Sequence, residues 1–150
     1  MIYKIASKTV AKRLREILSE VISKEQLVFV PGQLINDNII TTYECMHFMK
    51  KKRARDGCFC ALKLDIGKAY DRLEWDYLQK VMIKLGFHRL WVDMIIRRVN
   101  SVSFSLILNG SKLDTFKPSR GIRQGDPISA YLFLLAAKGL QASSNFVLDH

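Results

Sequence analysis

The stretch LKLDIGKAYDRLEWD, residues 62–76, places the carboxylate of Asp65 directly after a short apolar segment that is typical of a β-strand. A charge at the end of a buried strand is costly unless it has a partner. Asp65 could cap the following turn or pair with Lys63 or Lys68. It could also bind a divalent cation, because Mg²⁺ takes one or two carboxylates together with water and substrate phosphates.

A second unusual stretch is SRGIRQGDPIS, residues 119–129, which precedes a very apolar segment. Its glycines permit close backbone approach to a ligand, and Arg120 and Arg123 can bind phosphates or stack on bases. The start of the following helix also favours phosphate. The alternative is a surface loop with Ser129 as the helix N-cap, and the spacing of a P-loop is missing.

The charge of the chain favours a polyanionic partner, with nucleic acid ahead of an anionic membrane surface. The 150 residues carry a net charge of +10 and a pI of about 9.7. The densest basic cluster consists of Lys50, Lys51, Lys52, Arg53 and Arg55. This cluster suits a solvated helix end, a nuclear-import patch or a contact with a nucleic-acid backbone.

Other classes of protein fit the sequence poorly. No apolar run reaches the ~20 residues of a membrane span, and the N-terminus lacks the apolar core of a secretory signal. The three cysteines, Cys45, Cys58 and Cys60, do not have the spacing of a zinc site. We therefore expect reduced thiols in an intracellular protein with neither a zinc site nor a membrane partner.

Apolar spacing predicts helices over 3–22, 38–53, 72–85, from near Arg89 through Val99, and over 128–142. Asn36 or Asp37 is expected to cap the second helix. Asp71 and Glu74 have the form of a capping box ahead of the third.

The predicted strands are fewer. Residues 58–65 form one, after a Pro31-Gly32 turn and the second helix, and residues 101–116 form a hairpin around Asn109-Gly110. The third helix ends at Gly86. This order predicts an α+β fold with helices packed on a small antiparallel sheet.

Taken together, LDIGKAYDRLEW and SRGIRQGDPIS closely resemble the reverse transcriptase domain of non-LTR retrotransposons, the LINE-type elements abundant in plants. KTVAKRLREILSEVISKEQLVFVPGQLINDN and TTYECMHFMKKKR resemble the fingers of that domain. The resemblance covers essentially the whole chain. It implies a partial right-hand polymerase, with fingers-like helices over about 1–57 and a partial palm over about 58–150.

The resemblance implies roles for individual residues. Asp65 takes the place of a catalytic metal ligand, and the backbone carbonyl of Ile66 helps to hold the same ion. Tyr70 matches the aromatic residue that closes against a ribose 2′-OH and so selects deoxynucleotides. The residues that the resemblance places beside the incoming nucleotide and template are Arg123, Gln124 and Gly125.

The resemblance also implies the partners. These are Mg²⁺ or Mn²⁺, deoxynucleoside triphosphates, an RNA template and a DNA primer, and the nucleus is the expected location. Contacts with the nucleic-acid backbone are expected from Lys50, Lys51, Lys52, Arg53 and Arg120.

The sequence departs from the family pattern at one decisive point. The family's second catalytic motif contains two adjacent aspartates on a hairpin, and these 150 residues contain no such pair. We therefore expect a truncated fragment that is inactive as an isolated chain, because two-metal chemistry needs several carboxylates. The alternatives are a non-catalytic RNA- or DNA-binding remnant, a translated pseudogene that aggregates, and an RNA-dependent RNA polymerase, against which Tyr70 argues.

Overall fold

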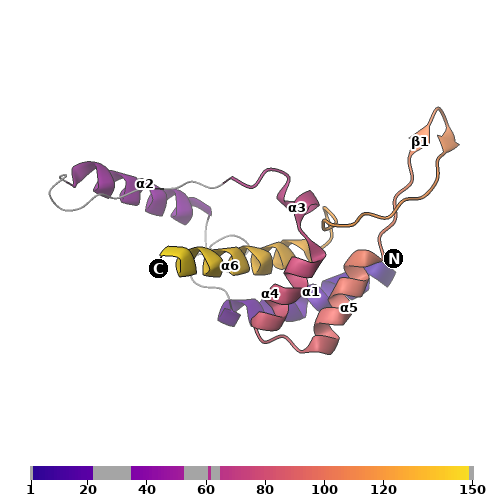
Figure 1. Cartoon of the computed structure of the whole chain (residues 1–150), viewed down its shortest axis with the longest axis horizontal. Helices are drawn as coiled ribbons and strands as arrows, with labels where there is room; N and C mark the ends of the chain where they lie inside the picture. The colour runs from indigo at the N-terminus through magenta and orange to yellow at the C-terminus, as the bar shows by residue number, and fades with distance from the viewer. Residues whose placement is uncertain (1, 22–34, 53–60, 62–64, 149–150) are drawn as a thin grey trace.

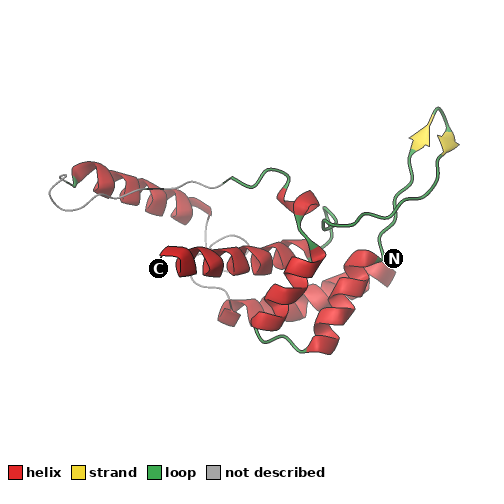
Figure 2. Ribbon diagram, viewed as in Figure 1, coloured by secondary structure: helices red, strands yellow, loops and turns green. Residues whose placement is uncertain are grey.

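The computed structural model describes residues 2–21, 35–52, 61 and 65–148. Within them the chain is mainly helical, with one short hairpin (Figure 2). The elements in chain order are α1 (Ile2–Val21), α2 (Ile35–Lys51), α3 (Ala69–Arg72), α4 (Trp75–Lys84), α5 (Arg89–Asn100), β1 (Ile107–Leu108), β2 (Ser111–Lys112) and α6 (Ser129–Leu148).

Helices α1, α3, α4, α5 and α6 form a bundle (Figure 1). Helix α6 packs against α1, α3 and α4, and α4 packs in turn against α5. Helix α2 and the hairpin extend from the bundle in roughly opposite directions. Among the described residues, α2 packs on no other element. No helix of the described part is long and apolar enough to cross a membrane.

One hydrophobic core joins the N-terminal helix to the later ones. Helix α1 buries Val10, Leu14 and Leu18 at the spacing of one helical face. Helix α6 is apolar around much of its circumference because it has neighbours on several sides. The other core residues are Leu73, Leu78, Met82, Val92, Ile95, Val99, Ile122, Ile128, Leu132, Leu134, Leu135 and Ala136. Full burial of such a side chain contributes about 1.5–3 kcal/mol.

The end of α4 falls where the sequence predicted it. Gly86 has φ = 88°, which is the left-handed conformation that favours glycine. The N–H of Gly86 donates to the Ile83 carbonyl at 3.0 Å, and the N–H of Phe87 donates to the Met82 carbonyl at 3.1 Å. This pair of bonds is a Schellman motif, which satisfies the last carbonyls of the helix.

The Asn109-Gly110 turn is also confirmed. Asn109 and Gly110 both have positive φ, 49° and 82°, as a type I′ hairpin turn requires. The strands pair antiparallel, with Ile107 opposite Lys112, and Phe104 forms an isolated bridge with Phe116. The α+β class with a small antiparallel sheet is therefore confirmed, although no helix of the described part covers this sheet.

The helix starts differ from the predictions at two places. Helix α2 begins at Ile35, so Asn36 and Asp37 lie in its first turn and neither is the N-cap. The predicted helix over 72–85 is interrupted, because Glu74 is extended, with φ = −73° and ψ = 131°. Glu74 is itself the N-cap of α4 and its side chain makes no capping bond, so the capping box was a wrong prediction.

Some predictions fall outside the described residues. They concern the Pro31-Gly32 turn, Arg53, Cys58 and Cys60, and all of the 58–65 strand except Ala61 and Asp65, which lie in no regular element. Cys45 is an exposed free thiol. Helix α1 agrees with the predicted helix, α5 begins at Arg89 as expected, and α6 runs beyond the predicted end to Leu148.

Helices α4 and α6 approach each other closely at Gly139. A Cβ at this position would lie 2.5 Å from Val81 Cγ2 and 2.9 Å from the Tyr77 hydroxyl. We expect Gly139→Ala to lower the free energy of unfolding by about 1–3 kcal/mol, because the added methyl overpacks this contact. Urea unfolding monitored by circular dichroism measures the loss.

The matched control is Gly67→Ala, because no atom lies within 4 Å of a Cβ built there. That variant should stay within about 0.5 kcal/mol of wild type. Equal stabilities for the two variants would contradict the close α4–α6 approach.

Candidate functional site

Hydrogen bonds join the two chemically unusual stretches of the sequence. The N–H of Ile122 donates to the Tyr70 carbonyl and that of Gly121 donates to the Leu73 carbonyl, both at 2.8 Å. The indole Nε1 of Trp75 donates to the Gly121 carbonyl at 2.7 Å. Residues 70–75 and 121–122, about fifty positions apart in the chain, are therefore fixed side by side.

Gly121 is required at this junction for a physical reason. Its φ is 93°, and a Cβ would lie 3.0 Å from the Asp71 carbonyl oxygen. A larger residue would meet both backbone strain and a backbone contact that cannot move like a flexible side chain. The glycine therefore permits the close approach between the 119–129 loop and the end of α3.

This junction brings three of the predicted site residues to one cavity. Tyr70, Gln124 and Gly125 line a cavity of about 460 Å³, here called the Tyr70 cavity. The Tyr70 ring stacks on Phe133 of α6, with ring centroids 5.5 Å apart and planes inclined by 17°. The remaining lining residues are Asp126, Pro127, Ser129 and Ala130. A cavity of this size accommodates a small ligand.

The loop that forms one wall of the Tyr70 cavity is held at its base. Gly125 has φ = 78°, so the chain turns sharply after Gln124, whose side chain is exposed. The Ser129 hydroxyl donates to the Arg123 carbonyl at 2.6 Å. Ser129 is thus the first residue of α6 and closes the loop, instead of capping the helix as the alternative interpretation had it.

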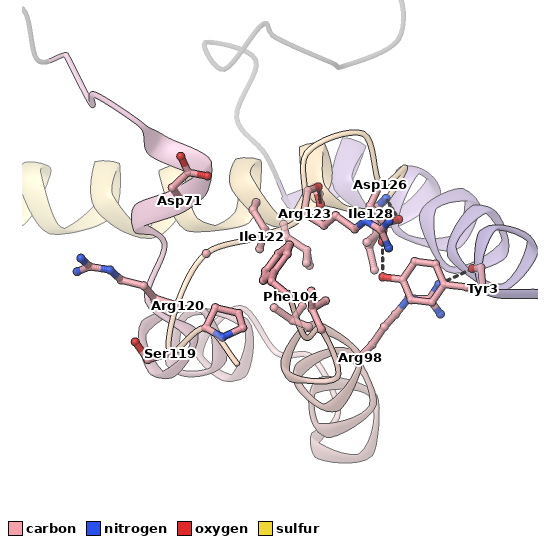
Figure 3. A pocket seen from close by; sticks show the side chains of 16 residues that line it. Tyr3, Asp71, Arg98, Phe104, Ser119, Arg120, Ile122, Arg123, Asp126 and Ile128 are labelled. Carbon is pink, nitrogen blue, oxygen red and sulfur yellow. Dashed lines mark hydrogen bonds between the residues drawn. The ribbon is translucent and has the colours of Figure 1, made fainter. Parts of the chain in front are cut away.

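The two arginines of the loop lie on a different cavity. Arg120 and Arg123, together with Arg98 of α5, line a cavity of about 370 Å³, here called the Arg98 cavity (Figure 3). Arg120 forms a 3.5 Å ion pair with Glu74, and both side chains are more than half exposed. Such a pair contributes little to stability, so Arg120 remains available to an anion.

The predicted metal ligands are exposed. Asp65 lies in a loop, and Ile66 has 47% of its surface exposed. Among the residues the structure describes, no three His, Cys, Asp or Glu side chains group together as a metal site would require. The Asp65 carboxylate and the Ile66 carbonyl fit one part of a Mg²⁺ site, but the described residues do not complete a two-metal site.

Lys50, Lys51 and Lys52 of the basic cluster line neither cavity. Lys50 and Lys51 end α2, and Lys52 Nζ lies 5.4 Å from the Phe48 ring centroid. Because α2 projects from the bundle, the structure does not bring these lysines to the Tyr70 cavity (Figure 1). Arg53 lies outside the described residues.

Residues that the sequence did not single out support the loop. Asp126 is buried, with 9% of its surface exposed. It accepts hydrogen bonds from the hydroxyls of Tyr3, at 2.5 Å, and Ser7. In the sequence, Asp126 is marked only as an acid within a glycine-rich loop before an apolar helix. This pattern does not predict that its hydrogen-bond partners lie on α1. Burial raises the pKa of Tyr3, and the hydrogen bond to Asp126 raises it further.

Comparison with known proteins identifies the family. Residues 1–145 match the family model described as reverse transcriptase (RNA-dependent DNA polymerase). The uncharacterized 149 kDa protein of transposon TX1 from Xenopus laevis is 34% identical over 135 residues, which are 89% of this chain and 10% of that protein. The chain therefore belongs to the reverse transcriptase family.

A second relative agrees. The Retrovirus-related Pol polyprotein from the type-2 retrotransposable element R2DM of Drosophila melanogaster is 33% identical over 78 residues, 52% of this chain and 7% of that protein. The chain thus spans a tenth or less of these relatives. The resemblance to the reverse transcriptase domain of non-LTR retrotransposons is confirmed.

The Trp75–Gly121 bond can be tested with a pair of tryptophan substitutions. Trp75→Phe removes the N–H that donates to Gly121, whereas Trp91→Phe removes a buried N–H that has no acceptor among the described residues. We expect Trp75→Phe to destabilise the chain by about 1 kcal/mol more than Trp91→Phe, because a hydrogen bond is lost in the first variant alone. Chemical denaturation of both variants measures the difference, and equal losses would contradict the prediction.

The partly buried hydroxyls of Tyr3 and Tyr77 predict a dependence of stability on alkaline pH. Burial raises the pKa of Tyr3 and Tyr77 above the ordinary 10.0. The folded state holds these two protons more tightly than the unfolded state does. The free energy of unfolding is therefore unaffected by their titration below pH 10 and falls as the pH rises above it. Urea unfolding between about pH 8 and about pH 11 measures the fall. The double variant Tyr3→Phe, Tyr77→Phe should lose less stability over this interval, and an equal fall would refute the assignment.

Proposed function

We propose that this chain is part of the RNA-directed DNA polymerase of a non-LTR retrotransposon and forms its nucleotide-facing surface. The observation that carries the proposal is the Tyr70 cavity, where Tyr70 meets Gln124 and Gly125 from a loop some fifty residues later. These are the residues that the family resemblance places beside the incoming nucleotide. Family membership supports the same assignment.

The cavity suits a deoxynucleotide for physical reasons. The Tyr70 ring is held on one side by its stacking on Phe133, so its position is fixed relative to the cavity. A fixed ring can exclude a ribose 2′-OH by contact, which discriminates more strongly than a mobile one. Gly125 brings backbone close to the ligand, and the exposed Gln124 amide can both donate and accept hydrogen bonds.

The positive charge supports a role in holding template and primer. A net charge of +10 favours the phosphate backbone with little sequence preference. Arg120, Arg123 and the lysines that end α2 are the proposed contacts. The proposed setting is the nucleus, where the family meets chromosomal DNA.

The chemistry needs more than this chain supplies. Asp65 and the Ile66 carbonyl are the proposed ligands of one Mg²⁺ or Mn²⁺, which would neutralise phosphate charge when bound. The 150 residues contain no adjacent pair of aspartates. We therefore propose that the isolated chain binds nucleic acid and nucleotide without extending a primer. A non-catalytic nucleic-acid-binding role is the second candidate, favoured by the same charge.

Binding of fluorescent nucleotides to the purified chain, with a DNA primer annealed to an RNA template and Mg²⁺, tests the proposal. Wild type should bind a deoxynucleotide more tightly than the matching ribonucleotide. Tyr70→Ala should reduce this preference about tenfold or more, because the fixed ring is lost. Tyr43→Ala removes an aromatic residue that is 72% exposed on α2 and should leave the preference unchanged.

Primer extension on the same duplex forms the second arm. We expect none from wild type or from Asp65→Asn, and equal, salt-sensitive duplex binding by both. Extension that disappears in Asp65→Asn would refute the inactivity of the isolated chain while supporting the polymerase site. Equal binding of both nucleotide types by wild type would contradict the nucleotide cavity and leave the non-catalytic role.

A further inference from the structure

We infer that Tyr3 and Ser7 of α1 are positioning residues for the loop that carries Gln124 and Gly125. The inference rests on the proposed function, because it assigns these two hydroxyls to the nucleotide cavity without placing them in contact with the ligand. Neither residue lines the Tyr70 cavity. They act through Asp126, the residue that follows Gly125.

The starting point is the burial of Asp126. Asp126 has 9% of its surface exposed, and an unpartnered carboxylate on so buried a residue would be costly. The loop itself provides one donor to it, the N–H of Ile128 at 3.3 Å. The other donors are the hydroxyls of Tyr3, to Oδ2 at 2.5 Å, and Ser7, to Oδ1. Each carboxylate oxygen thus accepts a hydrogen bond from a hydroxyl of α1.

The two hydroxyls are suited to this task by their place on the helix. Tyr3 and Ser7 are four residues apart, so they lie one above the other on one face of α1. Ser7 is completely buried, and its helix is anchored in the core through Leu14 and Leu18. Helix α1 therefore acts as a rigid support, and Asp126 is the point at which the loop is attached to it.

Tyr3 is itself held by Arg98 of α5, and the guanidinium of Arg123 in the loop also lies 5.8 Å from its ring centroid. Arg98 Nη2 donates to the Tyr3 carbonyl at 2.7 Å, and the guanidinium lies 4.2 Å from the Tyr3 ring centroid. Figure 3 shows the end of Arg98 against the Tyr3 ring and the Tyr3 hydroxyl bonded to Asp126. The chain of contacts from α5 through Tyr3 to the loop leaves the hydroxyl little freedom, so loss of that hydroxyl should release the turn at Gly125.

The consequence concerns the Tyr70 cavity. Asp126 immediately follows Gly125, and its backbone N–H and carbonyl also bond within the loop, to Arg123 and Ser129 at 3.4 and 3.0 Å. A shift of Asp126 therefore moves the Gly125 backbone directly. Because bonding geometry at a binding site tolerates only small displacements, we expect a change in nucleotide affinity without any change in the groups that touch the nucleotide.

The test compares Tyr3→Phe with Tyr77→Phe. Tyr77→Phe also removes one tyrosine hydroxyl bond, the 3.0 Å bond to the Ala136 carbonyl, which joins α4 to α6 and not to the loop. In ¹H–¹⁵N spectra of the isotopically labelled chain, the amide signals of Gln124 and Gly125 should move in Tyr3→Phe and stay in place in Tyr77→Phe. Ser7→Ala, a smaller change, should move the same signals and serves if Tyr3→Phe fails to fold.

Nucleotide titration completes the experiment. Tyr3→Phe should bind the fluorescent deoxynucleotide about five- to tenfold more weakly than wild type, and Tyr77→Phe should stay within about twofold. If no variant binds nucleotide, the proposed function fails, yet the amide signals still decide whether α1 positions the loop. Unmoved Gln124 and Gly125 signals in folded Tyr3→Phe or Ser7→Ala would overturn the inference.

Discussion

The contact on which the site depends is the meeting of residues 70–75 with Gly121 and Ile122. Two backbone N–H groups and one indole N–H make it, at 2.7–2.8 Å. The two backbone N–H groups satisfy the Tyr70 and Leu73 carbonyls, which the interruption between α3 and α4 would otherwise leave without a partner, and the indole N–H satisfies the Gly121 carbonyl. The same bonds place Tyr70 opposite the 119–129 loop, so the local stability of this junction and the shape of the Tyr70 cavity have a common origin.

The loop has a second constraint, which comes from the other end of the chain. Helix α1 shares one core with α4, α5 and α6, and its two hydroxyls reach the buried Asp126. The proposed division into fingers-like helices over about 1–57 and a partial palm over about 58–150 remains a prediction. The packing nevertheless links α1 to the palm side of that division, because α1 contacts α6 directly.

The parts of the fold that sequence could predict are those set by local rules. Helices α1 and α5 follow from apolar spacing, and the hairpin follows from Asn109-Gly110. The helix predicted over 72–85 was wrong at its start, because tertiary hydrogen bonds to the Tyr70 and Leu73 carbonyls outweigh a local capping pattern. Tyr70, Gln124 and Gly125 were recognised through a family resemblance, whereas Asp126 was missed because its partners are more than a hundred residues away.

The two functions proposed for this site, nucleotide binding and catalysis, therefore separate in this chain. The residues that shape the Tyr70 cavity are held by the bundle, and neither α2 nor the hairpin contributes to that cavity. The geometry of the Tyr70 cavity consequently depends on packing and hydrogen bonds within the described residues. Catalysis depends on charge compensation, and each ~1.4 kcal/mol of missing transition-state stabilisation lowers the rate tenfold. The proposed metal site has one exposed carboxylate, Asp65, where two-metal chemistry uses several ligands, so the proposed nucleotide cavity does not by itself make an active polymerase.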